Sequence, residues 1–420
     1  MYQNIPILKY VGVERIELSP HDPQPRILPL NYTPLPNPVI LTNFNSVVIF
    51  ICYTLNNMKK VLILTASYGA GHVKASEALI EQFSKKHIQP HVIDLVLQGG
   101  VSERMVASFY ALLMRKGHFV WKSYHDKIMP IKKGEVIRSI YEMLHRNKFI
   151  KEIEKVSPDI IVSTMDTASL ISHLYKKKHP DVKTYTVLTD YVAHPLWVWK
   201  STDHYFVGSN EAQNFLIEQG VDVKNISISG IPLRASFEKK IEKHKARKAL
   251  GIPEDMQVVL ISTGTYKSVP VEPIIQALSA QLLSFAVILA GNSSENVVEC
   301  AGILKEYGVQ GRAVSYAENM EEFMAASDVY ISKAGGLTVA ECLASGLPAL
   351  YMNNFPGHEE GNAGYAFSHG AAITVSDKNL LKETLENLLK SPEKIQEMSK
   401  NALKIAKPHA AGEIVDKILL

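Results

Sequence analysis

The stretch SKAGGLTVAECLASGLPALYMNNFPGHEEGN, from Ser332 to Asn362, decides the fold. It predicts a glycine turn, an apolar helix, a short buried strand and then a polar loop with two adjacent glutamates. Glycine at the start of a helix lets an anion approach the open main-chain N–H groups. Carboxylates in the loop can accept hydrogen bonds from sugar hydroxyls. The order therefore indicates one unit of a parallel α/β sheet that holds a phosphate and a sugar.

The length and composition describe a globular protein with more than one core. The chain has 420 residues, which favours two domains. Hydrophobic residues make up 46% and charged residues 21%, and the formal charge of +3 gives no argument for a nucleic-acid partner. Cys52, Cys300 and Cys342 form neither a CxxC pair nor a metal spacing, which is typical of small buried side chains in a reducing compartment.

Residues 1–57 differ from the rest of the chain. The segment 16–38 is rich in proline and lacks periodicity, whereas Met58 directly precedes a strongly apolar run. We expect residues 1–57 to be a disordered or spurious extension, with Met58 as the natural start. The alternative is a weak membrane anchor over 39–55, a segment near the lower length limit for a span.

Apolar runs that predict buried strands alternate with helical patterns from residue 59 onward. The first group of runs covers 59–66, 91–96, 159–164, 184–189 and 204–209, with a helix predicted over 72–86. After Gly230-Ile231-Pro232 the pattern restarts with a charged helix over 238–251 and a second helix over 270–283. The second group of runs covers 257–263, 285–291, 328–332 and 348–352.

This alternation predicts an α/β fold of two Rossmann-like, doubly wound domains that face each other across a cleft. We expect an N-terminal domain over 58–235, a C-terminal domain over 236–395 and terminal helices over 396–420 that cross back to the first domain. Doubly wound sheets bind ligands at the carboxyl ends of their strands. One site in the cleft between the domains is therefore expected.

The segment 104–155 interrupts the alternation and is strongly basic. It holds twelve Lys and Arg against five Asp and Glu, a charge of +7, which leaves −4 for the rest of the chain. Large apolar side chains, among them Phe119 and Trp121, are interleaved with cations such as Lys132 and Lys133. This mixture suits the surface of an anionic membrane. A solvated helical hairpin packed on the domain is the alternative.

Two loops of the predicted first domain carry side chains that could take part in catalysis or in binding of an acceptor. TASYGAGHVKAS (65–76) ends a strand with glycines and opens a helix with His72, and a histidine in such a place could take a proton from a hydroxyl. LTDYVAHPLWVW (188–199) brings Asp190, His194 and Trp197 to a loop that should reach the cleft. A packing histidine and a proline-bent surface loop are the alternatives.

Two turns of the predicted second domain suit a nucleotide. STGTYKS (262–268) places Gly264 and Thr265 after a strand, where they could form part of a diphosphate pocket. In the opening stretch, amides of the 333–338 turn and the Thr338 hydroxyl can face a phosphate. Glu341, one turn further along, can accept both hydroxyls of a ribose.

These motifs together resemble the inverting glycosyltransferases with two Rossmann-like domains (GT-B), which include the peptidoglycan N-acetylglucosaminyltransferase and the glycosyl-diacylglycerol synthases. The match covers about 58–400 and is nearest to the diacylglycerol glycosyltransferase or monogalactosyldiacylglycerol synthase branch. It is carried by YGAGHVKASEAL (68–79), TDYVAHPLWVWKSTDHYFVGSNEAQNFLIEQGV (189–221), ISGIPLR (228–234), SKAGGLTVAECLASGLPAL (332–350) and PGHEEGNA (356–363).

The resemblance implies a UDP-sugar as the donor substrate, with no metal and no separate cofactor. It implies a donor site made of Gly264, Thr265, Tyr316, Met320, Gly335, Gly336, Thr338, Glu341, His358, Glu359, Glu360 and Asn362. It implies an acceptor and membrane side made of Gly71, His194, Trp197, Phe119, Trp121, Lys132 and Lys133. His358 stands where the diacylglycerol branch commonly has glutamine, which leaves glucose, galactose and N-acetylglucosamine open as the sugar.

The activity implied is transfer of a hexose, most simply glucose, to a membrane lipid such as diacylglycerol, with inversion at the anomeric carbon. His72 would remove the acceptor proton, with Asp190 nearby, and amides at Gly336 and Gly264 would offset the charge of the leaving diphosphate. The expected place is the cytoplasmic face of the cell membrane, as a peripheral protein. A transferase to another lipid, a UDP-sugar epimerase of the same architecture and a non-catalytic UDP-sugar-binding protein remain alternatives.

Overall fold

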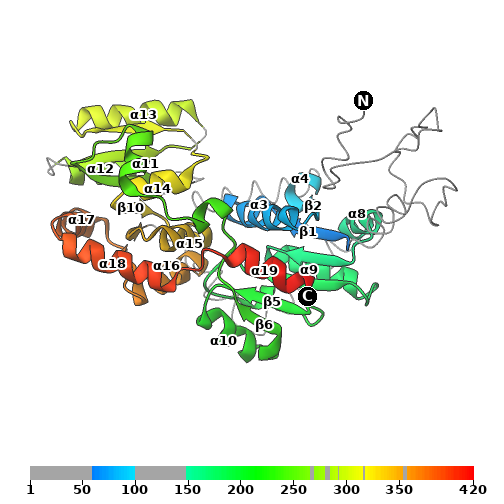
Figure 1. The fold of residues 1–420 in the computed structure, drawn as a ribbon. Helices are drawn as coiled ribbons and strands as arrows, with labels where there is room; N and C mark the ends of the chain where they lie inside the picture. Colours follow the sequence, from blue (N-terminus) through cyan, green and yellow to red (C-terminus); the bar gives the residue numbers. More distant parts are fainter. Residues whose placement is uncertain are drawn as a thin grey trace, which may run out of the picture. The chain divides into compact units, whose positions relative to one another are not determined.

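The computed structural model describes residues 59–99, 148–264, 269–279, 284–291, 293–315, 317–352 and 357–420. They belong to one compact unit, Lys59–Leu420, that contains two β-sheets (Figure 1). The predictions on residues 1–57, and those on the basic segment as far as residue 147, lie outside the described residues.

The first sheet is parallel throughout, and its six described strands run in the order β2-β1-β3-β4-β5-β6. The strands are β1 Val61–Thr65, β2 His91–Asp94, β3 Ile160–Ser163, β4 Lys183–Val187, β5 His204–Val207 and β6 Ile226–Ile228. The helical elements are α3 Ala70–Lys85, α4 Leu95–Gln98, α8 Lys148–Val156, α9 Asp166–Lys176, η1 Pro195–Trp197, α10 Asn210–Glu218 and η2 Val223–Asn225. The central strands are buried on both faces, which explains their unbroken apolar runs.

The second sheet is also parallel, in the order β12-β11-β10-β7-β8-β9. The strands are β7 Gln257–Ser262, β8 Ser284–Leu289, β9 Gly311–Val314, β10 Val329–Ser332, β11 Ala349–Met352 and β12 Ala372–Val375. The helical elements are η3 Ala235–Glu238, α11 Lys243–Leu250, α12 Val271–Leu278, α13 Ser294–Glu306, α14 Met320–Ala326, α15 Gly336–Ser345, α16 His358–Ser368, η4 Lys378–Leu380, α17 Leu381–Leu389, α18 Pro392–Ile405 and α19 Ala410–Leu419. Counted from β7, this is the Rossmann order 3-2-1-4-5-6.

Several predicted boundaries were wrong for local reasons. The run 91–96 is a strand only as far as Asp94, because the Asp94 carboxylate accepts hydrogen bonds from Val96 N and Leu97 N and so caps α4. The charged helix predicted over 238–251 covers only Lys243–Leu250, since Glu242 is extended. The polar loop expected after β11 becomes helix α16 from His358 onward.

Three strands, β6, β9 and β12, were not predicted at all. Each lies at an edge of its sheet and is only partly buried, so it lacks the continuous apolar run of a central strand. These strands therefore escape a search for continuous apolar runs because they lie at the edges of their sheets.

The chain returns to the first sheet at its end. Ala411, Ile414, Val415 and Ile418 of α19 belong to the apolar cluster that includes Val61 and Phe83. Helix α18, by contrast, packs against α15 and α17 of the second sheet (Figure 1). The segment between these two helices thus joins the core of one sheet to that of the other.

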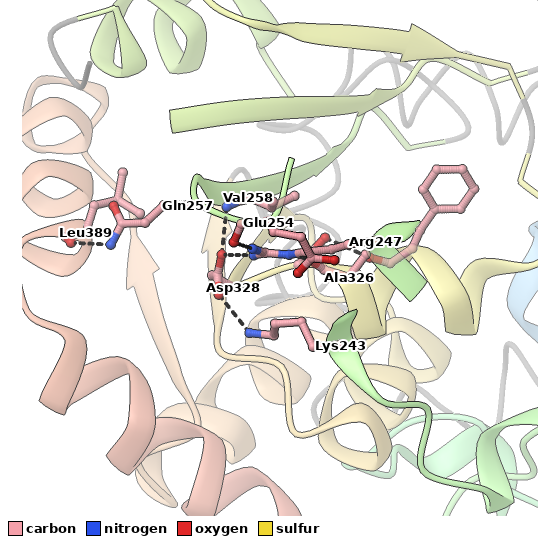
Figure 2. A network of polar contacts seen from close by, with 10 residues as sticks. Lys243, Arg247, Glu254, Gln257, Val258, Ala326, Asp328 and Leu389 are labelled. Carbon is pink, nitrogen blue, oxygen red and sulfur yellow. Dashed lines mark hydrogen bonds and ion pairs between the residues drawn. The ribbon is translucent and has the colours of Figure 1, made fainter. Parts of the chain in front are cut away.

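A partly buried ion-pair network ties the N-terminal ends of two central strands of the second sheet (Figure 2). Asp328, just before β10, accepts hydrogen bonds from Arg247 Nη2, Lys243 Nζ and the Val258 amide, each at 2.7 Å. The Arg247 guanidinium is 5% exposed and also donates to the carbonyls of Ala326 and Glu254. The network therefore fixes β7 beside β10 from the end opposite the carboxyl termini.

Removing the acid of this network should destabilise the fold. In Asp328→Ala the buried Arg247 loses its partner, which typically costs about 3–5 kcal/mol. We expect a clear fall in the urea midpoint, followed by circular dichroism. Asp416→Ala, which breaks an exposed pair with Lys86, is the matched control and should leave the midpoint unchanged. Equal midpoints in the two variants would contradict a structural role for the network.

Candidate active site

A cavity of about 650 Å³ opens where the carboxyl ends of both sheets meet. It is lined on one side by the loops after β1, β3 and β4, and on the other by the loops after β7, β8 and β10. The strand order reverses between β1 and β3 in the first sheet and between β7 and β10 in the second. Ligands of doubly wound sheets bind at such reversal points, and here two of them share one cavity.

His72 stands at the first of these points, in the first turn of α3. Its Nδ1 lies 3.1 Å from the Thr164 carbonyl oxygen and 2.8 Å from Thr189 Oγ1. A carbonyl oxygen only accepts, so the contact with Thr164 is a hydrogen bond in the Nδ1–H tautomer, which in the neutral ring leaves the lone pair on Nε2. The ring is half-buried and lines the cavity, so this nitrogen is suited to accept a proton from a bound hydroxyl.

Two helix N-termini without a side-chain cap face the same cavity. Helix α3 begins after Gly69 and α15 after Gly335, and no side chain caps either start. Their first amides are therefore open to a ligand, and the helix dipoles favour an anionic one. Gly264, which follows β7 with φ +71°, also lines the wall.

Gly336 lies against the first domain so closely that no side chain would fit. A Cβ on Gly336 would lie 1.9 Å from the Thr189 carbonyl oxygen and 2.9 Å from Asp190 Oδ1. The next residue of α15, Leu337, lies near the start of α3, since a Cβ on Gly71 would lie 3.9 Å from the Leu337 Cβ. The starts of α3 and α15 are thus brought together by residues without side chains.

Glu341 lines the cavity from α15, and its carboxyl is only partly exposed. Loss of hydration raises the pKa of Glu341 to about 7, with the charge of Glu321 adding to this effect and that of Arg234 opposing it. Near neutral pH the group is therefore divided between a carboxylate and a carboxylic acid. The carboxylate form can accept hydrogen bonds from two hydroxyls at once.

The first turn of α16 divides its polar residues between different surroundings. His358 and Glu359 line the cavity, and the Glu359 carboxylate, which is 2% exposed, is paired with Lys333 Nζ at 2.5 Å. Glu360 is exposed to solvent and does not line the cavity. Asn362 is fully buried behind the wall. A helix turns successive side chains in different directions, so these four residues do not all face the cavity. The helix itself was not predicted here.

The predicted acceptor loop reaches the cavity only through its first part. Asp190 lines the cavity, whereas Trp197 is 1% exposed and packs in the apolar cluster with Leu188 and Tyr205. The prediction that Trp197 contacts an acceptor was therefore wrong for this structure, because η1 turns the indole inward. His194 lies beside Trp197, 5.9 Å between ring centroids, and does not line the cavity.

Most of the described candidates do come together. Those that line the cavity are Gly71, His72, Asp190, Gly264, Met320, Gly335, Gly336, Thr338, Glu341, His358 and Glu359. Those outside the described residues are Phe119, Trp121, Lys132, Lys133, Thr265 and Tyr316. Their individual roles toward a donor or an acceptor stay predictions.

Sequence reasoning missed the cations of the cavity wall. Lys74, Arg234 and Lys333 all line it. Arg234 donates to the Glu318 carbonyl at 2.7 Å and pairs with Glu321 at 3.0 Å. Its place two residues after Gly230-Ile231-Pro232, near the boundary between the predicted domains, is the signal that could have identified it. Among the described residues, no group of three His, Cys, Asp or Glu is placed to hold a metal ion.

Comparisons with known proteins agree with this architecture. Residues 72–233 match the family described as monogalactosyldiacylglycerol (MGDG) synthase, and residues 239–414 match the glycosyltransferase family 28 C-terminal domain. Acinetobacter baumannii MurG superposes with a TM-score of 0.57 at 16% identity, over 86% of this chain and 99% of that one. The UDP-GlcNAc 2-epimerase of Neisseria meningitidis gives the same values. At such identity these two structures support the fold alone.

The fold and the shared cavity define an α/β protein of the GT-B class, as predicted. The processive diacylglycerol β-glucosyltransferase of Bacillus mycoides is 30% identical over 373 residues, 86% of this chain and 93% of that protein. The enzyme of the same name from Bacillus pumilus is 27% identical, over 87% and 96%. The chain belongs to this family of glycosyltransferases, which confirms the resemblance drawn from its motifs.

Adding a methyl group at Gly336 should disable the site. In Gly336→Ala the main chain of Thr189 must move by more than 1 Å, and a displacement of that size typically costs about 10²-fold in rate. We expect a comparable loss of glycosyltransferase activity. Gly364→Ala in α16, where a Cβ meets nothing within 4 Å, is the control and should keep full activity. An active Gly336→Ala enzyme would show that this close approach is not required.

Proposed function

We propose that this chain transfers glucose from UDP-glucose to diacylglycerol, with inversion at the anomeric carbon, in glycolipid synthesis. One observation carries the proposal: His72, whose Nδ1 lies 3.1 Å from the Thr164 carbonyl oxygen, shares a cavity with the uncapped glycine start of α15. The names of the Bacillus relatives support glucose as the sugar and diacylglycerol as the acceptor. The glycosyltransferase family 28 domain supports a UDP-sugar as the donor.

In the proposed reaction the acceptor hydroxyl oxygen attacks the anomeric carbon from the face opposite UDP. A new C–O bond forms while the bond to the UDP oxygen breaks, and UDP leaves with the electron pair. His72 Nε2 takes the hydroxyl proton, and its Nδ1–H bond to Thr164 holds the ring in the required orientation. Main-chain amides at the start of α15 offset the charge that develops on the diphosphate.

The proposed place of the reaction is the cytoplasmic face of the cell membrane, where the enzyme would be peripheral. None of the described helices is long and apolar enough to cross a membrane. The sequence of segment 104–155, basic and rich in large apolar residues, supports contact with an anionic lipid surface. The proposal includes no metal, no cofactor besides the UDP-sugar substrate and no nucleic-acid partner.

The deciding experiment measures UDP release and glycolipid formation with a panel of UDP-sugars and liposomes that contain diacylglycerol, with and without EDTA. We expect glucosyl-diacylglycerol from UDP-glucose, with EDTA having no effect. His72→Ala should lose most turnover, about 10²-fold or more, yet bind UDP normally. His91→Ala, at the exposed start of β2, is the matched control. Sugar epimerisation, or UDP binding without any transfer, would refute the proposal.

Binding of UDP should depend on the ionisation of Glu341. We expect Glu341→Ala to weaken UDP binding, because the ribose hydroxyls lose their acceptor. A pKa of about 7 means that the carboxylate fraction rises as the pH increases, roughly tenfold between pH 6 and pH 8. The affinity for UDP should rise in the same direction, measured by calorimetry.

Glu341→Gln provides the control for that pH dependence. Glutamine keeps the shape of the side chain but does not titrate, so any remaining pH dependence belongs to the UDP phosphate, whose second pKa is about 6. An identical pH profile for the wild type and Glu341→Gln would show that Glu341 does not bind UDP through its carboxylate.

A further inference from the structure

Asn362 uses its whole side-chain amide in hydrogen bonds, although it is fully buried. Its Oδ1 accepts from the Tyr191 amide at 2.7 Å. Its Nδ2 donates to Asp190 Oδ1 at 2.7 Å and to the Ala334 carbonyl at 3.2 Å. Both donors and the acceptor of this amide are thus satisfied inside the protein, and its exposure is 0%. A sugar would find no bonding capacity left on Nδ2.

The partners of Asn362 belong to both sides of the cavity. Asp190 and Tyr191 follow β4 of the first sheet, directly after Thr189, whose hydroxyl lies 2.8 Å from His72 Nδ1. Ala334 follows β10 of the second sheet and directly precedes the glycine start of α15. One buried amide therefore connects the support of the histidine with the turn that faces the proposed diphosphate.

Neighbouring contacts show that α16 fits closely against the same loop. A Cβ on Gly361 would lie 2.6 Å from Val192 Cγ2, so a larger residue would push the loop away. The rings of Tyr191 and Tyr365 are stacked with their centroids 4.3 Å apart. In α16 these contacts involve Gly361 and Tyr365, which lie on either side of Asn362 in the sequence. The loop after β4 is thus held by α16 along residues 190–192.

We propose that Asn362 is a positioning residue that sets the separation between His72 and the start of α15, and that it does not bind the sugar. The role differs from the donor contact implied by the resemblance, and it rests on the proposed transfer reaction. Asn362 holds the loop of Asp190 and Tyr191 against Ala334. It thereby fixes the position of His72, the proposed base, relative to the site of the UDP leaving group. Without it, both substrates still bind, but at the wrong separation for attack.

The test replaces Asn362 with leucine, which has nearly the same size but makes none of the three hydrogen bonds. We expect Asn362→Leu to lower kcat by about 10²-fold, the usual cost of a displacement of about 1 Å, while the Kd for UDP is unchanged. The control is Asn401→Leu. It removes the hydrogen bond from the side-chain amide of Asn401 to the Gly370 carbonyl, which lies away from the cavity, and should leave kcat unchanged. Should Asn362→Leu fail to fold, Asn362→Ala removes the same three hydrogen bonds without adding a charge beside Asp190 and is measured in the same way.

Hydrogen exchange provides a second measurement that needs no substrate. Loss of the acceptor for the Tyr191 amide should speed exchange in the segment 188–192 of Asn362→Leu, and not in Asn401→Leu. An unchanged kcat together with unchanged exchange would overturn the positioning role. A loss of UDP affinity equal to the loss of kcat would also overturn it, because Asn362 would then be a donor ligand. If the wild type makes no glucolipid, the proposed function fails, and the exchange result still decides whether Asn362 holds the loop.

Discussion

The contact between Gly336 and the Thr189 carbonyl is the constraint on which the site depends. The start of α15 and the loop after β4 come from different sheets, and they approach to a distance that excludes even a methyl group. Because this contact exists, the open amides of α15 and the imidazole of His72 face one cavity rather than two separate surfaces. Asn362 and the Tyr191–Tyr365 stack extend the same contact away from the cavity.

Helix α3 connects this contact with the rest of the molecule. Its N-terminus carries His72, and its C-terminal half holds the linker, since Glu81 accepts from the Ala235 amide and Gln82 donates to Glu238. The returning helix α19 packs on the same helix. A rigid helix of 16 residues thus joins the proposed base to both crossings between the sheets. Any movement of one sheet relative to the other would therefore displace His72.

Local patterns were enough to predict the central strands and the glycine starts of α3 and α15, but not the burial of single side chains. Strands such as β1 and β10 are covered on both faces, so their sequences are continuously apolar. His72 and Gly336 lie in the first turns of the helices that follow such strands, and this position implies a place at the carboxyl edge. Trp197 and Asn362 were assigned to ligands because each follows a strand that was predicted correctly, β4 and β11. Their inward orientation depends on residues far along the chain, such as Tyr205 and Ala334, which no local pattern contains.

The acids of the cavity wall raise a question of charge, because a UDP-sugar is itself anionic. Of the three described acids that line the cavity, Asp190, Glu341 and Glu359, Glu359 is neutralised by Lys333, and Lys74 and Arg234 add two further cations to the wall. Glu341 holds a proton for part of the time near neutral pH, since burial raises its pKa to about 7. The field that the proposed diphosphate would meet is therefore set by the open amides of α3 and α15 and by these cations rather than by carboxylates alone. Preorganised amides of this kind stabilise developing charge without rearranging during the reaction, so under the proposed function the acids of the wall do not prevent binding of an anionic donor or release of an anionic product.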